Sequence, residues 1–252
     1  MGAPEVAPLI RFEQVAKSFG SKVIYEDLTL DVYPGENLVI IGGSGTGKSV
    51  MLKCLIGLIQ STAGRIWYQD REITAMDEAA LIEIRRQIAY VFQQAALFDS
   101  MTVYENIAYP LRIHLALTED EIRDKVDLNL ERVGLPGAGN LMPSELSGGM
   151  RKRIGLARAI ALEPSVILWD EPTTGLDPSN TRRISELILK MQADLKVTSL
   201  VVTHDMGSAM LVGDRIALLH EKRIHQVLPK AAIAQEPPGS LLKNFIEGNL
   251  AL

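Results

Sequence analysis

One segment of eight residues constrains the fold of this chain more than any other feature of its sequence. It fits the pattern G-x-x-x-x-G-K-[ST] and consists of Gly42, Gly43, Ser44, Gly45, Thr46, Gly47, Lys48 and Ser49. An apolar run, residues 38–41, precedes it, and a helical pattern, residues 50–58, follows it. Glycines before a helix can form a simple turn, but a buried strand, a loop and a helix in this order predict a phosphate-binding loop.

The residue types of this loop suit the binding of a nucleoside triphosphate. Glycines let successive backbone N–H groups converge on phosphate oxygens, and the start of the following helix adds positive potential at the same place. Lys48 is expected to reach the β and γ phosphates, and the Ser49 hydroxyl is expected to bind Mg²⁺. The loop therefore predicts a bound nucleoside triphosphate with Mg²⁺.

Two further apolar runs, residues 166–169 and 200–203, end in polar or charged residues. Continuous apolar runs suit strands that are covered on both faces of a parallel sheet, and such sheets hold ligands at the carboxyl ends of their strands. Residues 9–33 alternate in polarity around a turn at Gly20 and Ser21 and predict short strands of an antiparallel edge region. Together these patterns favour an α/β fold.

Helical patterns occupy the middle and the end of the chain. Thr118 with Glu121 three residues on predicts a capping box, and apolar residues at helical spacing continue to Gly134. A second helix is expected over residues 149–162, ended by the proline at position 164. A short apolar helix is expected over residues 241–246.

Two neighbouring acids, Asp170 and Glu171, follow the apolar run 166–169. Side chains alternate along a strand, so these two are expected to point in different directions and to have different roles. Asp170 is placed to hold the Mg²⁺ shell, and Glu171 is placed to polarise the water that attacks the γ phosphate. Acidic residues at the end of a strand are often only exposed to solvent. The functional interpretation of this pair depends on the phosphate-binding loop at Lys48.

Composition limits the classes of partner. The 252 residues include 26 Lys plus Arg and 31 Asp plus Glu, so the formal net charge is 26 − 31 = −5, which disfavours nucleic acid as a partner. The single cysteine, Cys54, cannot form an internal disulfide and fits a reducing compartment. The apolar runs are too short to span a bilayer and no secretory signal is visible. We therefore expect a cytosolic chain whose partner supplies any membrane part.

A second glycine-rich element, Leu146-Ser147-Gly148-Gly149-Met150, opens a helical segment shortly before the acidic strand. Its serine hydroxyl and backbone amides predict another anion site at a helix start. With the phosphate-binding loop and the two acids, this element resembles the signature of ATP-binding cassette (ABC) ATPases, and the chain is identified as a member of that superfamily.

The resemblance covers nearly the whole chain and implies its fold. ABC cassettes are α/β proteins with a RecA-like P-loop NTPase core, an antiparallel β edge region and an inserted helical subdomain. The implied division is a core with its β subdomain over residues 9–93 and 164–228, a helical signature subdomain over residues 94–163 and a C-terminal tail over residues 229–252.

The resemblance also implies roles for single residues. Gln93 matches the glutamine that touches Mg²⁺ and the attacking water, Asp177 the aspartate that communicates between two sites, and His204 the histidine that contacts the γ phosphate. Phe19 falls where the family stacks an aromatic ring on adenine, although a lone aromatic on a strand is more often a core residue. Val50 stands where many members have Thr or Ser, so one hydroxyl contact to a phosphate is expected to be missing.

In this family two chains pair head to tail, and each ATP lies between the phosphate-binding loop of one chain and the signature of the other. The resemblance therefore implies a second copy of the chain as a partner. It also implies that Ser147, Gly148 and Gly149 act on the nucleotide of that copy.

Three segments indicate a particular group within the ABC family: residues 96–103, 106–111 and 141–150. They are similar to the ATPases of Mla systems, which move phospholipid between the membranes of Gram-negative bacteria, and Met150 in place of the usual signature glutamine is typical of that group. The implied partners are a membrane permease, a membrane-anchored MCE-domain protein that faces the periplasm and a small cytoplasmic STAS-domain protein. The chain itself is expected at the cytoplasmic face of the inner membrane. The groove for the permease is expected around residues 93–111.

Other functions remain as alternatives. The same motor drives importers of amino acids or metals, and related soluble ATPases act in DNA repair or on ribosomes. The latter carry coiled coils, zinc modules or two cassettes, and none of these is visible in the sequence. A regulator that binds nucleotide without turnover is disfavoured by Gln93, Glu171 and His204. The last twelve residues, 241–252, are a candidate for contact across the dimer.

Overall fold

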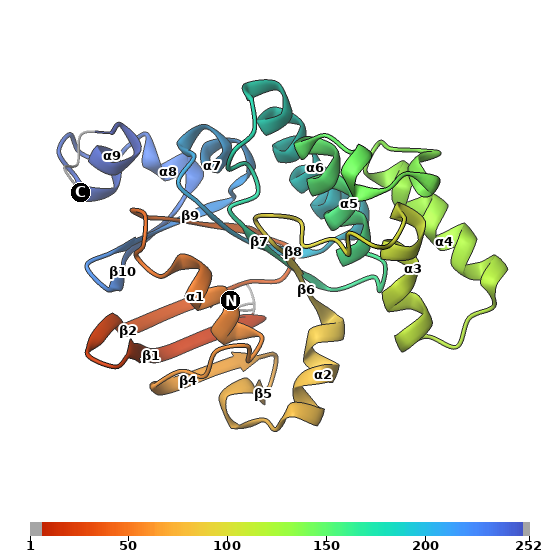
Figure 1. The fold of residues 1–252 in the computed structure, drawn as a ribbon. Helices are drawn as coiled ribbons and strands as arrows, with labels where there is room; N and C mark the ends of the chain where they lie inside the picture. The colour runs from red at the N-terminus through yellow and green to blue at the C-terminus, as the bar shows by residue number, and fades with distance from the viewer. Residues whose placement is uncertain (1–6, 249–252) are drawn as a thin grey trace, which may run out of the picture.

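The computed structural model describes residues 7–248, and the strands in this range form two sheets (Figure 1). The larger sheet has the order β10-β9-β3-β8-β7-β6. Its strands are β3 (Asn37–Ile41), β6 (Ile88–Val91), β7 (Val166–Asp170), β8 (Thr198–Thr203), β9 (Arg215–His220) and β10 (Arg223–Pro229). All neighbours are parallel except the edge pair β9 and β10.

The central strands β3, β7 and β8 are buried along their whole length. One face joins a core with helices α6 (Pro178–Leu195) and α7 (Met206–Val212), through Val39, Ile41, Ile167, Trp169 and Val201. The other face packs on helix α1 (Lys48–Leu55) and the smaller sheet, through Leu38, Ile40, Leu168, Leu200 and Val202. This burial on both faces is why the runs are apolar throughout, and the prediction of parallel strands is confirmed.

The smaller sheet has the order β2-β1-β4-β5 and is antiparallel. Its strands are β1 (Ile10–Phe19), β2 (Lys22–Val32), β4 (Ala63–Tyr68) and β5 (Arg71–Glu72). The turn at Gly20 and Ser21 is confirmed. The predicted antiparallel pairing of this region is confirmed, but the expectation of short strands is wrong, because β1 has 10 residues and β2 has 11. The central strand β1 also pairs with β4, so these strands form a sheet of their own. Bulges let these long strands bend over α1.

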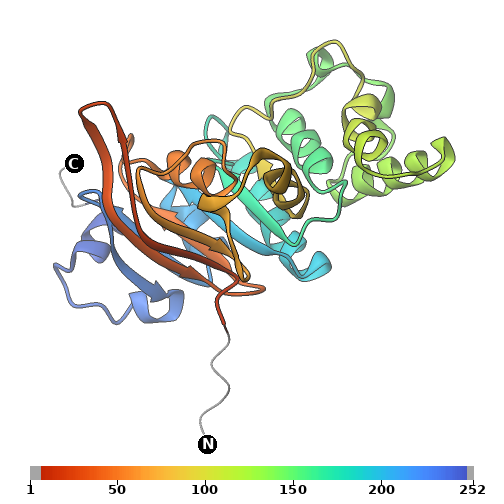
Figure 2. The same cartoon turned by 90° about the horizontal axis from the view of Figure 1, so that it is seen from below.

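The remaining helices lie beside the larger sheet. Figures 1 and 2 show three of them gathered at the end of the molecule away from β1 and β2: α3 (Val103–His114), α4 (Glu119–Arg132) and α5 (Gly148–Ala159). Helix α2 (Glu78–Gln87) precedes β6, and α8 (Lys230–Ile233) and α9 (Leu241–Ile246) follow β10. Within residues 7–248 no helix is long and apolar enough to cross a membrane.

The predicted helix starts are more accurate than the predicted ends. Thr118 caps α4 with Glu121 in a capping box, and Gly134 follows the helix with φ 67°. The expected end of α1 at residue 58 is wrong, because Gly57 takes φ 65°. Helix α5 ends at residue 159 rather than 162, before Glu163 at φ 53°. Helix α9 has the predicted bounds, and residues 249–252 of the tail lie outside the described residues.

Gly64 gives a test of how the smaller sheet is bent. It lies opposite the bulge of β1 with φ 78°, and a Cβ at this position would meet the Gln14 carbonyl oxygen at 2.3 Å. We expect Gly64→Ala to lower the free energy of unfolding in urea by about 3 kcal/mol. Gly20→Ala, also at positive φ but with open space around the added carbon, should cost about 1 kcal/mol. Equal losses would contradict this account.

Candidate active site

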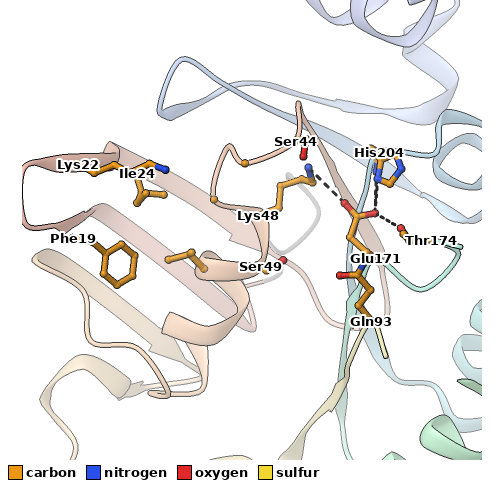
Figure 3. Close-up of a pocket in the computed structure, with 13 residues that line it drawn as sticks. Phe19, Lys22, Ile24, Ser44, Lys48, Ser49, Gln93, Glu171, Thr174 and His204 are labelled. Carbon is orange, nitrogen blue, oxygen red and sulfur yellow. Dashed lines mark hydrogen bonds and ion pairs between the residues drawn. The ribbon is translucent and has the colours of Figure 1, made fainter. Parts of the chain in front are cut away.

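The carboxyl ends of β3, β7 and β8 meet at one edge of the larger sheet, and a cavity of about 570 Å³ opens there (Figure 3). Ten of the residues that the sequence predicted for the site line it: Phe19, Ser44, Gly45, Gly47, Lys48, Ser49, Val50, Gln93, Glu171 and His204. They come from the hairpin of the smaller sheet, the loop after β3, the start of α1, the segment after β6 and the ends of β7 and β8.

The loop between β3 and α1 has a backbone that larger residues would obstruct. Gly47 has φ 100°, and a Cβ there would meet Ile24 Cγ2 at 2.3 Å. A Cβ at Gly42 would meet the Leu219 carbonyl oxygen at 2.5 Å. The Thr46 hydroxyl donates to the Gly43 carbonyl over 2.9 Å and closes the loop on itself. The glycines are therefore required by space as well as by conformation.

Lys48 begins α1 and turns back into this loop. Its Nζ donates to the carbonyl oxygens of Gly42 and Gly43 over 2.8 and 3.0 Å, and lies 3.6 Å from Glu171 Oε1. The side chain is 6% exposed, so burial lowers the pKa of Lys48, while the Glu171 carboxylate acts in the opposite direction. The ammonium group is thus held at the mouth of the loop, where an anion would meet it.

Asp170 and Ser49 form an oxygen pair beside Lys48. The Ser49 hydroxyl donates to Asp170 Oδ1 over 2.6 Å, and the Tyr90 hydroxyl donates to Oδ2 over 2.7 Å. Burial raises the pKa of Tyr90, which keeps its hydroxyl a donor. A serine hydroxyl and a carboxylate are hard oxygen ligands of the kind that Mg²⁺ prefers beside phosphates and water. The residues present therefore fit a Mg²⁺ ion at this point.

Glu171 lies next to Asp170 in sequence but takes φ 50° and turns into the cavity. Its Oε2 lies 2.8 Å from His204 Nδ1 and accepts from the Thr174 hydroxyl over 3.1 Å. A left-handed backbone at a non-glycine residue is strained, and such strain concentrates at functional sites. The two acids have different partners, but strand alternation is not the reason, because β7 ends at Asp170 and the left-handed turn directs Glu171. The arrangement gives Glu171 a fixed carboxylate that faces the cavity.

Phe19 and Gln93 lie on the rim of the cavity. Phe19 is 47% exposed, and Lys17 Nζ lies 4.4 Å from the centroid of its ring. The ring is therefore not a core side chain, and the plainer interpretation of this aromatic is wrong. Its role toward adenine and the role of Gln93 toward Mg²⁺ stay predictions.

The signature residues and Asp177 lie elsewhere. Ser147 caps α5 by accepting from the Met150 amide over 3.2 Å, and Asp177 caps α6 by accepting from the Asn180 amide over 3.0 Å. A Cβ at Gly149 would meet Asn180 Oδ1 at 2.8 Å, so the two helix starts are neighbours. Among the described residues, none of Ser147, Gly148, Gly149 and Asp177 lines the cavity at Lys48.

Sequence reasoning missed several side chains at or beside the site, among them Thr174, Tyr90 and Lys152. Lys152 Nζ donates to the carbonyl oxygens of Pro172 and Thr174 over 2.8 and 2.7 Å, and burial lowers the pKa of this lysine. The interpretation of the basic stretch after Met150 as a solvated helix face is therefore wrong at Lys152. Charge and helical spacing alone carried no signal for this contact.

Three comparisons place this geometry among known proteins. The family model described as ABC transporter matches residues 25–174. The "Probable ribonucleotide transport ATP-binding protein mkl" of Mycobacterium leprae is 44% identical over 241 residues, which are 95% of this chain and 69% of that protein. The "Intermembrane phospholipid transport system ATP-binding protein MlaF" of Escherichia coli K12 is 38% identical over 243 residues, which are 96% of this chain and 90% of that protein.

Solved structures agree with the family match. The structure of a dimeric bacterial ABC transporter cassette is similar with a TM-score of 0.81 and 31% identity, covering 88% of this chain and 98% of that one. A post-hydrolysis dimer of the same cassette bound to ADP and Pi gives a TM-score of 0.80. The chain has a phosphate-binding loop next to a carboxylate, and the ABC transporter family model matches more than half of its length. The chain therefore belongs to the ABC transporter family and is an ATP-binding ATPase of that family.

Proposed function

We propose that this chain is the ATP-hydrolysing subunit of a transporter that moves phospholipid between the inner and outer membranes and so maintains the lipid asymmetry of the outer membrane. The observation that carries the proposal is the match to E. coli MlaF along 96% of this chain and 90% of that protein. The segments around residues 96–111 and 141–150, with Met150, point to the same group.

Ribonucleotide transport is a second candidate. The M. leprae protein with that name is more similar, at 44% identity. This chain spans only 69% of its length, so the shared part is the motor and does not include everything in that protein. Importers of amino acids or other small solutes and soluble ABC ATPases are less favoured alternatives, because the segments around residues 96–111 and 141–150 resemble the Mla group.

In the proposed cycle the triphosphate of ATP binds along the loop from Gly42 to Ser49. The amides at the start of α1 and the Lys48 ammonium stabilise the β and γ phosphates. For this, Lys48 exchanges its present bonds to the Gly42 and Gly43 carbonyls for phosphate oxygens. Stacking of adenine on the exposed ring of Phe19 orients the other end of the nucleotide.

Asp170, Ser49 and Gln93 are the residues that would hold Mg²⁺. A bound Mg²⁺ ion neutralises charge on the β and γ phosphates. Ser49 and Asp170 already share a hydrogen bond, so their oxygens are close enough to bind one ion together.

Glu171 is the proposed general base. Its carboxylate accepts the proton of the attacking water, and its bonds to Thr174 and the contact with His204 fix its direction. His204 is more than half exposed at the cavity and is placed to contact the γ phosphate, while Gln93, which also lines the cavity, orients the water. Each of these roles is a proposal for this chain.

A second copy of the chain completes the site in this proposal. The similar cassettes were solved as dimers, and in this chain the signature lies outside the cavity at Lys48. Head-to-tail pairing brings Ser147, Gly148 and Gly149 of one copy to the γ phosphate held by the other. Asp177, next to the signature through Asn180, then lies between the two sites.

The proposed partners follow from the function. A membrane permease is expected to dock around residues 93–111, where Phe98 and Tyr109 are exposed and their ring centroids lie 5.2 Å apart. A membrane-anchored MCE-domain protein that faces the periplasm and a small cytoplasmic STAS-domain protein complete the complex, with this chain at the cytoplasmic face of the inner membrane. We also retain the division into a core (residues 9–93 and 164–228), a helical signature subdomain (94–163) and a tail (229–252).

The transported substrate can be tested on the complex that co-purifies with this chain. Reconstituted in vesicles with ATP, it should transfer fluorescent phospholipid to acceptor vesicles, and phospholipid should raise its ATPase rate. A radiolabelled ribonucleotide, added in trace amounts so that it does not compete with ATP, should not be transported. The reverse pattern would replace phospholipid with ribonucleotide as the substrate and leave the ATPase assignment intact.

Replacement of the proposed base gives a second test. Glu171→Gln should lower ATP turnover by at least about a hundredfold, because the amide cannot accept the proton, while ATP affinity stays within a few fold. Glu131→Gln, at an exposed position of α4, is the matched control and should keep wild-type turnover. Undiminished phosphate release by Glu171→Gln would refute the role of this residue.

Lys152 gives a third test, because it holds the segment that directly follows Glu171. Lys152→Met should lower kcat about tenfold while leaving ATP affinity unchanged, since the two bonds position that segment and touch no phosphate. Lys152→Arg should restore part of the rate, and Arg151→Met, at the exposed neighbour, should leave it within twofold of wild type. Equal effects of the Lys152 and Arg151 changes would contradict the assignment.

A further inference from the structure

Tyr90 lies in β6 and reaches the carboxylate that the proposed function assigns to Mg²⁺. Its hydroxyl donates to Asp170 Oδ2 over 2.7 Å, while Asp170 Oδ1 accepts from Ser49 over 2.6 Å. The two oxygens of one carboxylate therefore have two different donors. The oxygen shared with Ser49 is the one beside the phosphate-binding loop, and the oxygen bound to Tyr90 is the one turned toward β6.

The register of the sheet explains how Tyr90 reaches this far. Tyr90 pairs with Leu168 in the parallel ladder of β6 and β7, and both side chains belong to the core on the α1 face. Asp170 lies two residues beyond Leu168, which is about 6.6 Å further along the strand and on the same face. A tyrosine ring that leans along the strand spans this offset and delivers its hydroxyl to the carboxylate.

The ring of Tyr90 is held in place by its neighbours. Its centroid lies 4.4 Å from that of Phe92, and it packs against the buried core on the α1 face. Asp170 is 6% exposed, so little water reaches the carboxylate to replace a lost donor. A hydrogen bond in such surroundings is stronger than one at the surface, and it fixes the direction of the carboxylate.

We infer that Tyr90 is a positioning residue: its hydroxyl anchors Oδ2 of Asp170, so that Oδ1 faces Ser49 and the Mg²⁺ ion of the bound nucleotide. The inference rests on the proposed function, because it takes Asp170 as a residue that holds Mg²⁺. Tyr90 acts through Asp170 and touches neither the nucleotide nor the ion. Its hydroxyl should therefore matter for the Mg²⁺-dependent part of nucleotide binding and not for the rest.

The test is a Mg²⁺ titration of binding by the full chain. Calorimetry measures the affinity for AMP-PNP, an ATP analogue that resists hydrolysis, first in EDTA and then at rising Mg²⁺ concentrations. Tyr90→Phe should raise the Mg²⁺ concentration for half-maximal effect about tenfold, which corresponds to about 1.4 kcal/mol. The affinity in EDTA should stay within twofold of wild type.

Tyr68→Phe is the matched control. It removes the same group from a bond of the same length, 2.7 Å, to Ser165 at the opposite end of β7. This variant should keep the wild-type Mg²⁺ curve. A second variant without the hydroxyl, Tyr90→Leu, should reproduce the shift seen for Tyr90→Phe.

The possible outcomes separate the inference from the proposed function. If wild type shows no Mg²⁺ effect, the Mg²⁺ site itself is refuted and the inference falls with it. If wild type responds and Tyr90→Phe has the same curve, only the inference is overturned. It is also overturned if both Tyr90 variants weaken binding in EDTA, because Tyr90 would then be a structural residue of the loop.

Discussion

The buried ammonium of Lys48 is the interaction on which the site depends. It lies between the carbonyl oxygens of Gly42 and Gly43 and the carboxylate of Glu171, and almost none of it is exposed. A buried charge is stable only when it is paired and hydrogen-bonded, so the glycine loop and the acid must hold their positions around it. The parallel sheet provides these positions, because β3, β7 and β8 end at one edge. The fold therefore places a cation and two acids where an anionic ligand can replace the internal partners.

The sequence predicted the centre of the fold better than its periphery. Residues 38–41, 166–169 and 200–203 are apolar throughout because both faces of those strands are buried, and few arrangements besides a covered parallel sheet produce such runs. The strand β4 and the helix α2 were not predicted, since they bury one side and their signals are short. The end of α1 depends on the positive φ of Gly57, which periodicity does not report. The separate smaller sheet depends on pairing between β1 and β4, which are distant in sequence.

In the candidate site, too, some residues could be predicted from the sequence and others could not. Gly42 to Ser49, Asp170 and Glu171 were predicted because each follows a strand whose end is fixed by its apolar run. His204, Gln93 and Phe19 came from resemblance, and the structure brings them to one cavity with Lys48. Tyr90 and Lys152 could not be predicted, since both act by reaching atoms on other elements. The contacts of the Tyr90 hydroxyl on β6 and of the Lys152 amine on α5 can be identified only when strand register and helix packing are known. Trp169, which directly precedes Asp170, is buried, and its indole donates to Ser199 over 3.3 Å.

Helix α5 connects two parts of the site that lie apart within one chain. Its start carries the signature residues Ser147 to Gly149, and one turn later Lys152 holds the carbonyl groups of Pro172 and Thr174. Those carbonyls flank the segment whose Thr174 hydroxyl fixes Glu171. If a second copy presents its nucleotide to Ser147, any shift of α5 toward that nucleotide displaces Lys152 along with it, because a helix moves as a rigid rod over a single turn. The segment after Glu171 is then drawn with the helix, so the two hydrogen bonds of Lys152 link the signature to the carboxylate proposed as the base. This connection requires no contact between the two nucleotides, only that α5 and the strand end of β7 remain joined.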